Sequence, residues 1–311
     1  MFRLVLGISF TLLLQPLGLF GQKVSHADTI VTSPEFQVFE YYIQVPLGQT
    51  FVAPARCSGN TVVRYHLPPG KSNPICQVDT TPDLHLRTTI SMGAQTKTSY
   101  TQTESVSRGA NTAAVSYRVS GSMTIDDDPS KYITDMGLDP SVPMAMKMNL
   151  GYGSARIDLT DLKVRALEIV SGAADVIISY AKPSPCNMRF MNVSSGMSKI
   201  VIRNLDYARA ENVHIENGMG DTKIVVGKKI MSKSMVRIDV GTGKCTLLVN
   251  KDAPIKVIIN GTVFSSAAVP EGYTNTGDNT FISHSYKLNS QKAMTIVVDL
   301  GIGGFEMIPF E

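Results

Sequence analysis

The residues best able to do chemistry are scattered along the chain. Histidine occurs five times, as His26, His66, His85, His214 and His284. None of them stands in a metal-ligand spacing with cysteine or with another histidine. The acidic run Asp126-Asp127-Asp128 suits a hard cation such as Ca²⁺, but the alternating ligands, glycine and distal glutamate of an EF-hand loop are missing. No G-x-S-x-G segment supports a Ser-His-Asp hydrolase. We therefore expect no enzyme activity, no metal site and no cofactor.

Three basic residues form the candidate binding site. Arg156, Lys199 and Lys223 take similar positions near the start of predicted strands when the glycine segments described below are aligned. They would form a mild basic stripe on one face, suited to anionic glycans or lipid headgroups. The alternative is a solvated face whose charges discourage edge-to-edge strand pairing.

Cysteine occurs four times, as Cys57, Cys76, Cys186 and Cys245. In an oxidising compartment an even number of cysteines permits two disulfides. Cys57 and Cys76 flank a Pro/Gly-rich stretch at residues 68–70, and they are the expected disulfide pair. We expect Cys186 and Cys245 to remain separate thiols. None of the four has the C-x-x-C spacing of a zinc or redox site.

Short apolar strands interrupted by a glycine recur seven times in the second half of the chain. The anchor glycines are Gly151, Gly172, Gly196, Gly218, Gly241, Gly261 and Gly301. Their spacings are 21, 24, 22, 23 and 20 residues, and the last is 40, which we interpret as about two periods. A fixed period in this range is typical of a solenoid, in which each rung buries its apolar face only by stacking on its neighbours.

The strands around each glycine alternate apolar and polar residues. After the glycine, the expected inward pairs are Ile157/Leu159, Val176/Ile178, Ile200/Ile202, Ile224/Val226 and Leu247/Val249. Such alternation buries one face of each strand, so each rung should contribute to two stacked sheets. We attribute the glycines to tight turns that need a positive φ. The predicted fold is mostly β: a right-handed β-solenoid of about seven rungs, preceded by an N-terminal β region.

The rung pattern resembles the toast-rack (adhesin) domain family. The resemblance rests on segments such as Leu150-Gly151-Tyr152-Gly153 and Asn217-Gly218-Met219-Gly220-Asp221, and it covers roughly residues 145–308. The C-terminal domain of the LiaF-like cell-envelope regulators shares this rung. The resemblance implies a right-handed β-solenoid at the bacterial envelope, and the family pattern carries no catalytic motif. The several membrane helices of LiaF-like proteins have no counterpart in this sequence.

The N-terminal residues resemble a secretory signal, with Arg3 followed by an apolar stretch that Gln15 and Pro16 interrupt. Cleavage after Gly21 or after Ala27 is compatible with the sequence. We expect three parts: a signal peptide at 1–27, an N-terminal β region at 28–140, and a toast-rack-like β-solenoid domain at 141–311. The mature chain should contain no transmembrane span.

The formal charge of +3 falls to +1 once Arg3 and Lys23 are removed, and no basic run interleaves with aromatic residues. A nucleic-acid partner is therefore not expected. The predicted function is that of an exported, non-enzymatic adhesin-like or scaffolding module in the periplasm, at the cell surface or in the medium, with an unknown protein or glycan as its partner. Two alternatives stay open: a regulator of envelope-stress signalling through a membrane partner, and a polysaccharide-active β-helix enzyme.

Overall fold

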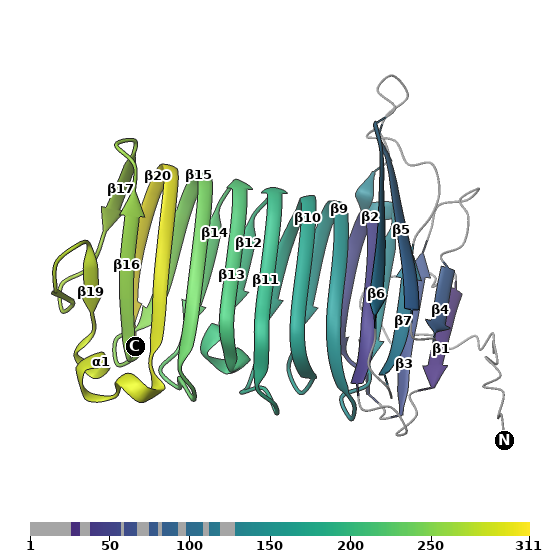
Figure 1. Cartoon of the computed structure of the whole chain (residues 1–311), viewed down its shortest axis with the longest axis horizontal. Coiled ribbons are helices and arrows are strands. Elements are labelled where there is room, and N and C mark those ends of the chain that lie inside the picture. The colour runs from purple at the N-terminus through teal and green to yellow at the C-terminus, as the bar shows by residue number, and fades with distance from the viewer. Residues whose placement is uncertain are drawn as a thin grey trace.

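The structure is a computed structural model that describes residues 26–31, 38–56, 59–66, 75–79, 83–92, 98–107, 112–118 and 128–311. Figure 1 shows an elongated stack of strands that runs from β2 to β16 and β17. The stack is a β-solenoid, as the glycine period predicts. Within the described residues no helix is long and apolar enough to cross a membrane. The right-handed sense of the coil stays a prediction.

Each rung contains two strand segments on either side of a corner. In β10 (Lys163–Ser179), residues 166–171 pair in parallel with β11 (Met188–Met197), whereas residues 176–179 pair with β12 (Ile200–Arg203). We call the layer before the corner the first sheet and the layer after it the second sheet. The remaining rungs are β9 (Pro143–Asp158), β13 (Ala210–Met219) with β14 (Thr222–Val226), β15 (Ser234–Asn250), β16 (Ile255–Gly261) with β17 (Ser265–Ala268), and β20 (Met294–Phe310).

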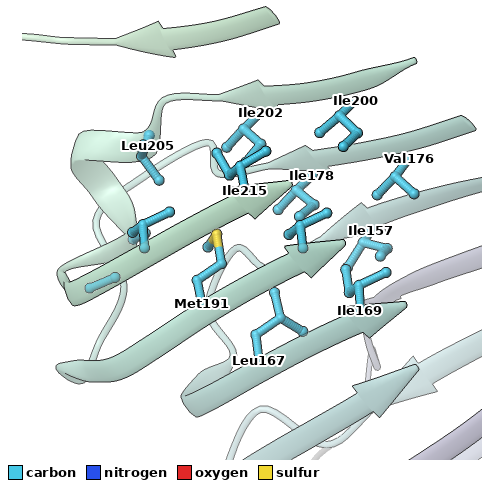
Figure 2. Packing of buried hydrophobic residues seen from close by; sticks show 14 of the residues in the cluster. Ile157, Leu167, Ile169, Val176, Ile178, Met191, Ile200, Ile202, Leu205 and Ile215 are labelled. Carbon is cyan, nitrogen blue, oxygen red and sulfur yellow. The ribbon is translucent and has the colours of Figure 1, made fainter. Parts of the chain in front are cut away.

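The hydrophobic core lies between the two sheets. Figure 2 shows Leu167, Ile169 and Met191 of the first sheet close to Val176 and Ile178 of the second. All five predicted inward pairs of the second strands are buried, so the period-2 alternation is confirmed. Because one apolar cluster runs from Phe39 to Met307, each rung is stabilised mainly by the rungs on either side of it.

The rungs do not stack in sequence order. β20 lies between β15 and β16, and it pairs in parallel with both (Figure 1). The 40-residue step is therefore not two periods along the stack. It contains β17, the antiparallel pair β18 (Thr274–Asn275) and β19 (Thr280–Ile282), and the helix α1 (His284–Leu288), after which the chain returns. β20 has 17 residues, as does β15, so it extends the pairing of β15 across both sheets, whereas β16 has only seven residues.

The anchor glycines are required for close packing and not for a positive φ. A Cβ atom placed on Gly172, Gly196, Gly218 or Gly241 would lie 3.0, 2.9, 2.7 or 2.5 Å from the carbonyl oxygen of the corresponding glycine in the preceding rung. Gly301 approaches the carbonyl of Gly241 in the same way. None of these residues has a positive φ. We call Gly151, Gly172, Gly196, Gly218, Gly241 and Gly301 the glycine ladder. Our attribution of these glycines to positive φ is therefore wrong.

A second set of glycines, two residues beyond the ladder, does have positive φ. Gly153, Gly220, Gly243 and Gly303 have φ between 124° and 141°. Glycine is required at these positions for two reasons. Their φ values favour glycine, and a Cβ atom would clash with the preceding rung, as at Gly243, which lies against the carbonyl of Gly220.

Gly261 does not belong to the ladder. It pairs with Leu300, one residue before Gly301. The following residue, Thr262, donates a hydrogen bond from its hydroxyl group to the carbonyl oxygen of Gly301. This side chain satisfies a carbonyl group at the C-terminal end of the stack. A glycine at regular spacing is thus an imperfect marker of the corner in the last rung.

The N-terminal strands continue the same stack. β2 (Val38–Pro54) pairs in parallel with β9 along both sheets, and Pro46 carries the carbonyl that Gly151 approaches. β2 also pairs with β7 (Thr112–Arg118) and β8 (Ile133–Leu138). β3 (Asn60–His66) joins β8 to β1 (His26–Val31), and β4 (Ile75–Asp79) pairs with β7. β2 is therefore a further rung, and the division of the chain near residue 140 stays a prediction.

The hairpin in the N-terminal region is formed by β5 (Asp83–Met92) and β6 (Thr98–Ser107), which pair antiparallel in a separate two-stranded sheet. The loose alternation of residues 96–103 predicts a hairpin with residues 113–119 through a turn at 107–111. That prediction is wrong, because this segment pairs with β5 before it, and β7 pairs with β2 and β4. β5 and β6 have equal length, and every residue of β5 pairs with a residue of β6.

A buried carboxylate holds one connector between rungs. Asp206, in the short 3₁₀ helix at Leu205–Ala208, is only 4% exposed and accepts a hydrogen bond of 2.7 Å from the backbone N–H of Gly227. Burial raises the pKa of Asp206 above the ordinary value of 3.8, although this hydrogen bond opposes the shift. The side chain thus links the turn after β12 to the turn after β14.

Replacing Gly218 with alanine should destabilise the protein. The new Cβ would lie 2.7 Å from the carbonyl of Gly196, so the stacked rungs would have to separate at the corner. We expect a loss of about 1–3 kcal/mol in the free energy of unfolding, the usual cost of overpacking, measured by urea denaturation. The matched control is Gly137→Ala, whose Cβ meets its nearest atom at 3.5 Å. Equal stability of both variants would contradict the proposed role of the ladder.

The stability contributed by Asp206 should fall as the pH rises. Since its folded pKa is raised, the folded state retains a proton that the unfolded chain loses above about pH 3.8, and the resulting stabilisation disappears as the pH passes through the folded pKa. Relative to wild type, Asp206→Asn should therefore become more stable as the pH increases from 4 to 7, measured as the difference in melting temperature. Asp278→Asn, at an exposed turn, is the control. A difference that does not change with pH would show that the carboxylate is not desolvated.

Candidate ligand-binding surface

The three predicted basic residues do not form a continuous stripe. All three are exposed: Arg156 and Lys223 lie on strands of the second sheet, whereas Lys199 directly precedes β12. Arg156 and Lys223 share one row across the strands, but Ile177 and Val201 separate them. Lys199 lies in a different row, and its backbone N–H donates to the Asp175 carboxylate at 2.8 Å.

The row that contains Lys199 alternates in charge. Asp175, Lys199, Asp221 and Lys244 occupy equivalent places in consecutive rungs, and the backbone N–H of Lys244 donates to Asp221 at 3.2 Å. The Lys244 ammonium also forms an ion pair of 2.6 Å with Glu306. The carboxylates next to Lys199 reduce its attraction for an anionic ligand. The stripe as an anion-binding surface stays untested, and this geometry weakens the case for Lys199.

A shallow hollow lies beside Arg156 on the same face. Its volume is about 260 Å³, and its lining includes Phe51, Asp158, Ile177, Ser179 and Arg203 as well as Arg156. The Arg156 guanidinium stacks over the Phe51 ring, with its carbon 5.6 Å from the ring centroid. In the register of the sheet, Ser179 on β10 lies opposite Arg203 of β12 on one side and opposite Asp158 of β9 on the other.

Sequence analysis missed Phe51 and Arg203. Phe51 belongs to β2, in the N-terminal region that showed no glycine period, and only the pairing of β2 with β9 places it beside Arg156. Arg203 lies four residues beyond Lys199, the residue that we aligned in the same rung. Period-2 alternation does predict that Arg203 faces outward, since Ile200 and Ile202 face the core.

A second polar surface lies on the first sheet, just before the glycine ladder. Glu216, Asp239 and Asp299 occupy one row on consecutive strands, and Asn260 follows on β16. They line a groove of about 470 Å³. Among the described residues, no group of three or more His, Cys, Asp and Glu side chains is placed to hold a metal ion.

Hydrogen bonds and ion pairs connect most of this row. Arg237 Nε lies 3.1 Å from Asp239 Oδ2, and a terminal nitrogen of Arg237 lies 2.9 Å from Asp299 Oδ2. His214 Nε2 lies 2.7 Å from Asp239 Oδ2, and the Asn260 amide donates to Asp299 at 2.7 Å. His214 is partly exposed on the outer face of its strand, as its apolar neighbours predict. These contacts join neighbouring rungs.

The charges of this network shift two pKa values. Burial alone would raise the pKa of Asp239, but the hydrogen bonds from Arg237 and His214 outweigh it, so the pKa lies below the ordinary value of 3.8. The same contact with Asp239 raises the pKa of Arg237. Asp239 is therefore ionised and paired at neutral pH, and the network stabilises stacked rungs more than it offers a free carboxylate to a ligand.

The two cysteines of the solenoid are separate thiols, as predicted. Cys245 is buried in the core, and burial raises its pKa to about 12. Cys186 is half-buried and donates from Sγ to the carbonyl of Val164 at 3.4 Å. Cys57 lies outside the described residues, so the pairing of Cys57 with Cys76 stays a prediction.

Cys245 should resist alkylation in the folded protein. A buried thiol with a raised pKa is neither accessible nor ionised, whereas Cys186 is partly accessible. Treatment with iodoacetamide at pH 8, followed by peptide mass spectrometry, should modify Cys186 faster than Cys245, and denaturation should remove the difference. Rapid labelling of Cys245 under native conditions would show that the core opens at this rung.

Residues 88–203 match the family model described as the N-terminal domain of toast_rack, DUF2154. The match runs from within β5 to the end of β12, so it begins well before residue 145, where the resemblance in rung pattern starts. It therefore includes β6, β7 and β8 of the predicted N-terminal β region.

No curated protein matches the chain. Among solved structures, the chain is similar to one described as a "putative cell adhesion protein" from Clostridium sporogenes ATCC 15579. The identity is 10%, the TM-score is 0.42, and the alignment covers 91% of this chain and 99% of that one. The family match at residues 88–203 supports the resemblance to the toast-rack family that the rung pattern suggests.

Proposed function

We propose that this chain is an exported, non-enzymatic adhesin-like module of the toast-rack type that presents a rigid β-solenoid surface at the bacterial cell envelope. The observation that carries the proposal is the continuous core, which runs through every rung and holds the outer side chains in straight rows. Rows of fixed spacing suit the recognition of extended partners, because many weak contacts add along them.

The corner presents an apolar row that supports a binding role. Met197 pairs in register with Met219, and the same row continues through Thr242 to Ile302. Met197, Met219 and Ile302 are 57%, 49% and 58% exposed, and Tyr152 lies in the corresponding place on β9. Contiguous exposed apolar side chains are a usual feature of interaction surfaces.

The signal-like N-terminus supports export, and the fold favours one of its two cleavage sites. β1 begins at His26, and its first two residues pair with Tyr65 and Arg64. Cleavage after Ala27 would remove these two residues, whereas cleavage after Gly21 would leave β1 whole. We therefore favour Gly21 as the cleavage site.

Cell fractionation tests both export and the envelope role. The full chain, expressed in a bacterial host, should be recovered outside the cytoplasm with its N-terminus at Gln22, as determined by N-terminal sequencing. The purified mature protein should then be retained on isolated cell envelopes and should release no sugars from them. Retention of residues 1–21 in a cytoplasmic product, or failure to bind envelopes, would contradict the proposal.

A further inference from the structure

The hollow beside Arg156 contains two guanidinium groups that lack a carboxylate partner. Neither Arg156 nor Arg203 has an acidic group within ion-pair distance among the residues that the structure describes. The one acidic lining residue is Asp158, whose Oδ1 accepts hydrogen bonds from the backbone and the hydroxyl group of Thr160. The carboxylate of Asp158 thus caps a turn, and the two arginines are available to an external anion.

The two arginines are placed to approach one anion from opposite sides. Arg156 is on β9 and Arg203 is on β12, with β10 between them. Neighbouring strands lie about 4.8 Å apart, so the two strands are separated by about 10 Å across the sheet. Arg203 aligns with Asp158 and therefore lies two residues, about 7 Å, further along the strand direction than Arg156. Arginine side chains can span that gap from both sides, and the hydroxyl of Ser179 lies on the intervening strand.

Stacking on Phe51 prepares Arg156 for planar recognition. The guanidinium carbon lies 5.6 Å from the centroid of the Phe51 ring, and both side chains line the hollow. A guanidinium in this position can donate two parallel hydrogen bonds to a carboxylate, a sulfate or a phosphate. Because the contact with Phe51 already restricts the Arg156 side chain, less side-chain entropy is lost when a ligand binds.

We propose that this hollow binds an acidic saccharide, with one carboxylate, sulfate or phosphate group between Arg156 and Arg203. The inference rests on the proposed envelope function and names a ligand class for it. Ser179 supplies a hydrogen-bonding group for a sugar hydroxyl, and Ile177 supplies an apolar floor for a ring face. Charge argues against a lipid surface, since polybasic membrane sites use clusters of about 4–8 basic residues.

Titration calorimetry with an oligogalacturonate tests the site. The wild-type chain should bind this carboxylated oligosaccharide and a sulfated counterpart, but not a neutral oligosaccharide of equal length. Arg156→Ala and Arg203→Ala should each weaken binding at least about tenfold, since each removes one charged partner. Arg156→Lys should also weaken binding, because lysine keeps the charge but loses the planar fork.

Two controls separate this site from diffuse charge. Arg189→Ala removes another exposed arginine that stacks on a phenylalanine, Phe190, at 5.2 Å, but outside the hollow. The double variant Lys199→Ala with Lys223→Ala removes the rest of the predicted stripe. Both should bind like wild type. An equal loss in either control would overturn the site, as would equal binding of the neutral oligosaccharide.

Vesicle binding and envelope retention distinguish failure of the saccharide site from failure of the proposed function. If vesicles of phosphatidylglycerol bind through Arg156 and Arg203 while the saccharides do not, the ligand is a lipid headgroup and the inference is wrong. If the Arg156→Ala with Arg203→Ala double variant is retained on cell envelopes like wild type, the hollow is not the site, although the envelope function stands. If the wild-type chain itself is not retained, the proposed function fails whatever the hollow binds.

Discussion

The close approach of backbone to backbone at one corner is the constraint on which this structure depends. At the glycine ladder, the carbonyl of one rung points at the Cα of the next, so no Cβ can be accommodated. Strands can then stack at the usual spacing of about 4.8 Å on both sides of the corner. If the corner opened, the parallel pairing of both sheets and the core between them would be disturbed together. Six glycines thus set the geometry of a much larger set of apolar contacts.

The order of rungs adds a long-range constraint. Because β20 enters between β15 and β16, the last strand of the chain completes the pairing of a strand formed about 60 residues earlier. β16 and β17 therefore gain their parallel neighbour only when the C-terminus is in place. Pairing between distant segments is slow to form, and here it joins the C-terminal strand to the interior of the stack rather than to its end.

The outer faces show how a solenoid divides structural roles from binding roles. On the first sheet, Arg237 joins Asp239 to Asp299, and the charges stabilise one another. On the second sheet, Arg156 and Arg203 are held by the fold but have no acidic partner among the described residues. The same regular spacing produces both arrangements. The difference lies in which side chains occur at equivalent places in adjacent rungs.

The sequence by itself determined the period and the inward-facing residues, because these depend on local alternation and on glycine spacing. Tertiary structure alone decided the place of β20, the offset of Gly261, the pairing of β5 with β6, and the contact of Phe51 with Arg156. The physical reason is that a parallel ladder joins strands at any separation along the chain, and alternation within a strand does not specify its neighbour. The period therefore predicts what each rung buries, whereas only the folded stack decides what lies beside it.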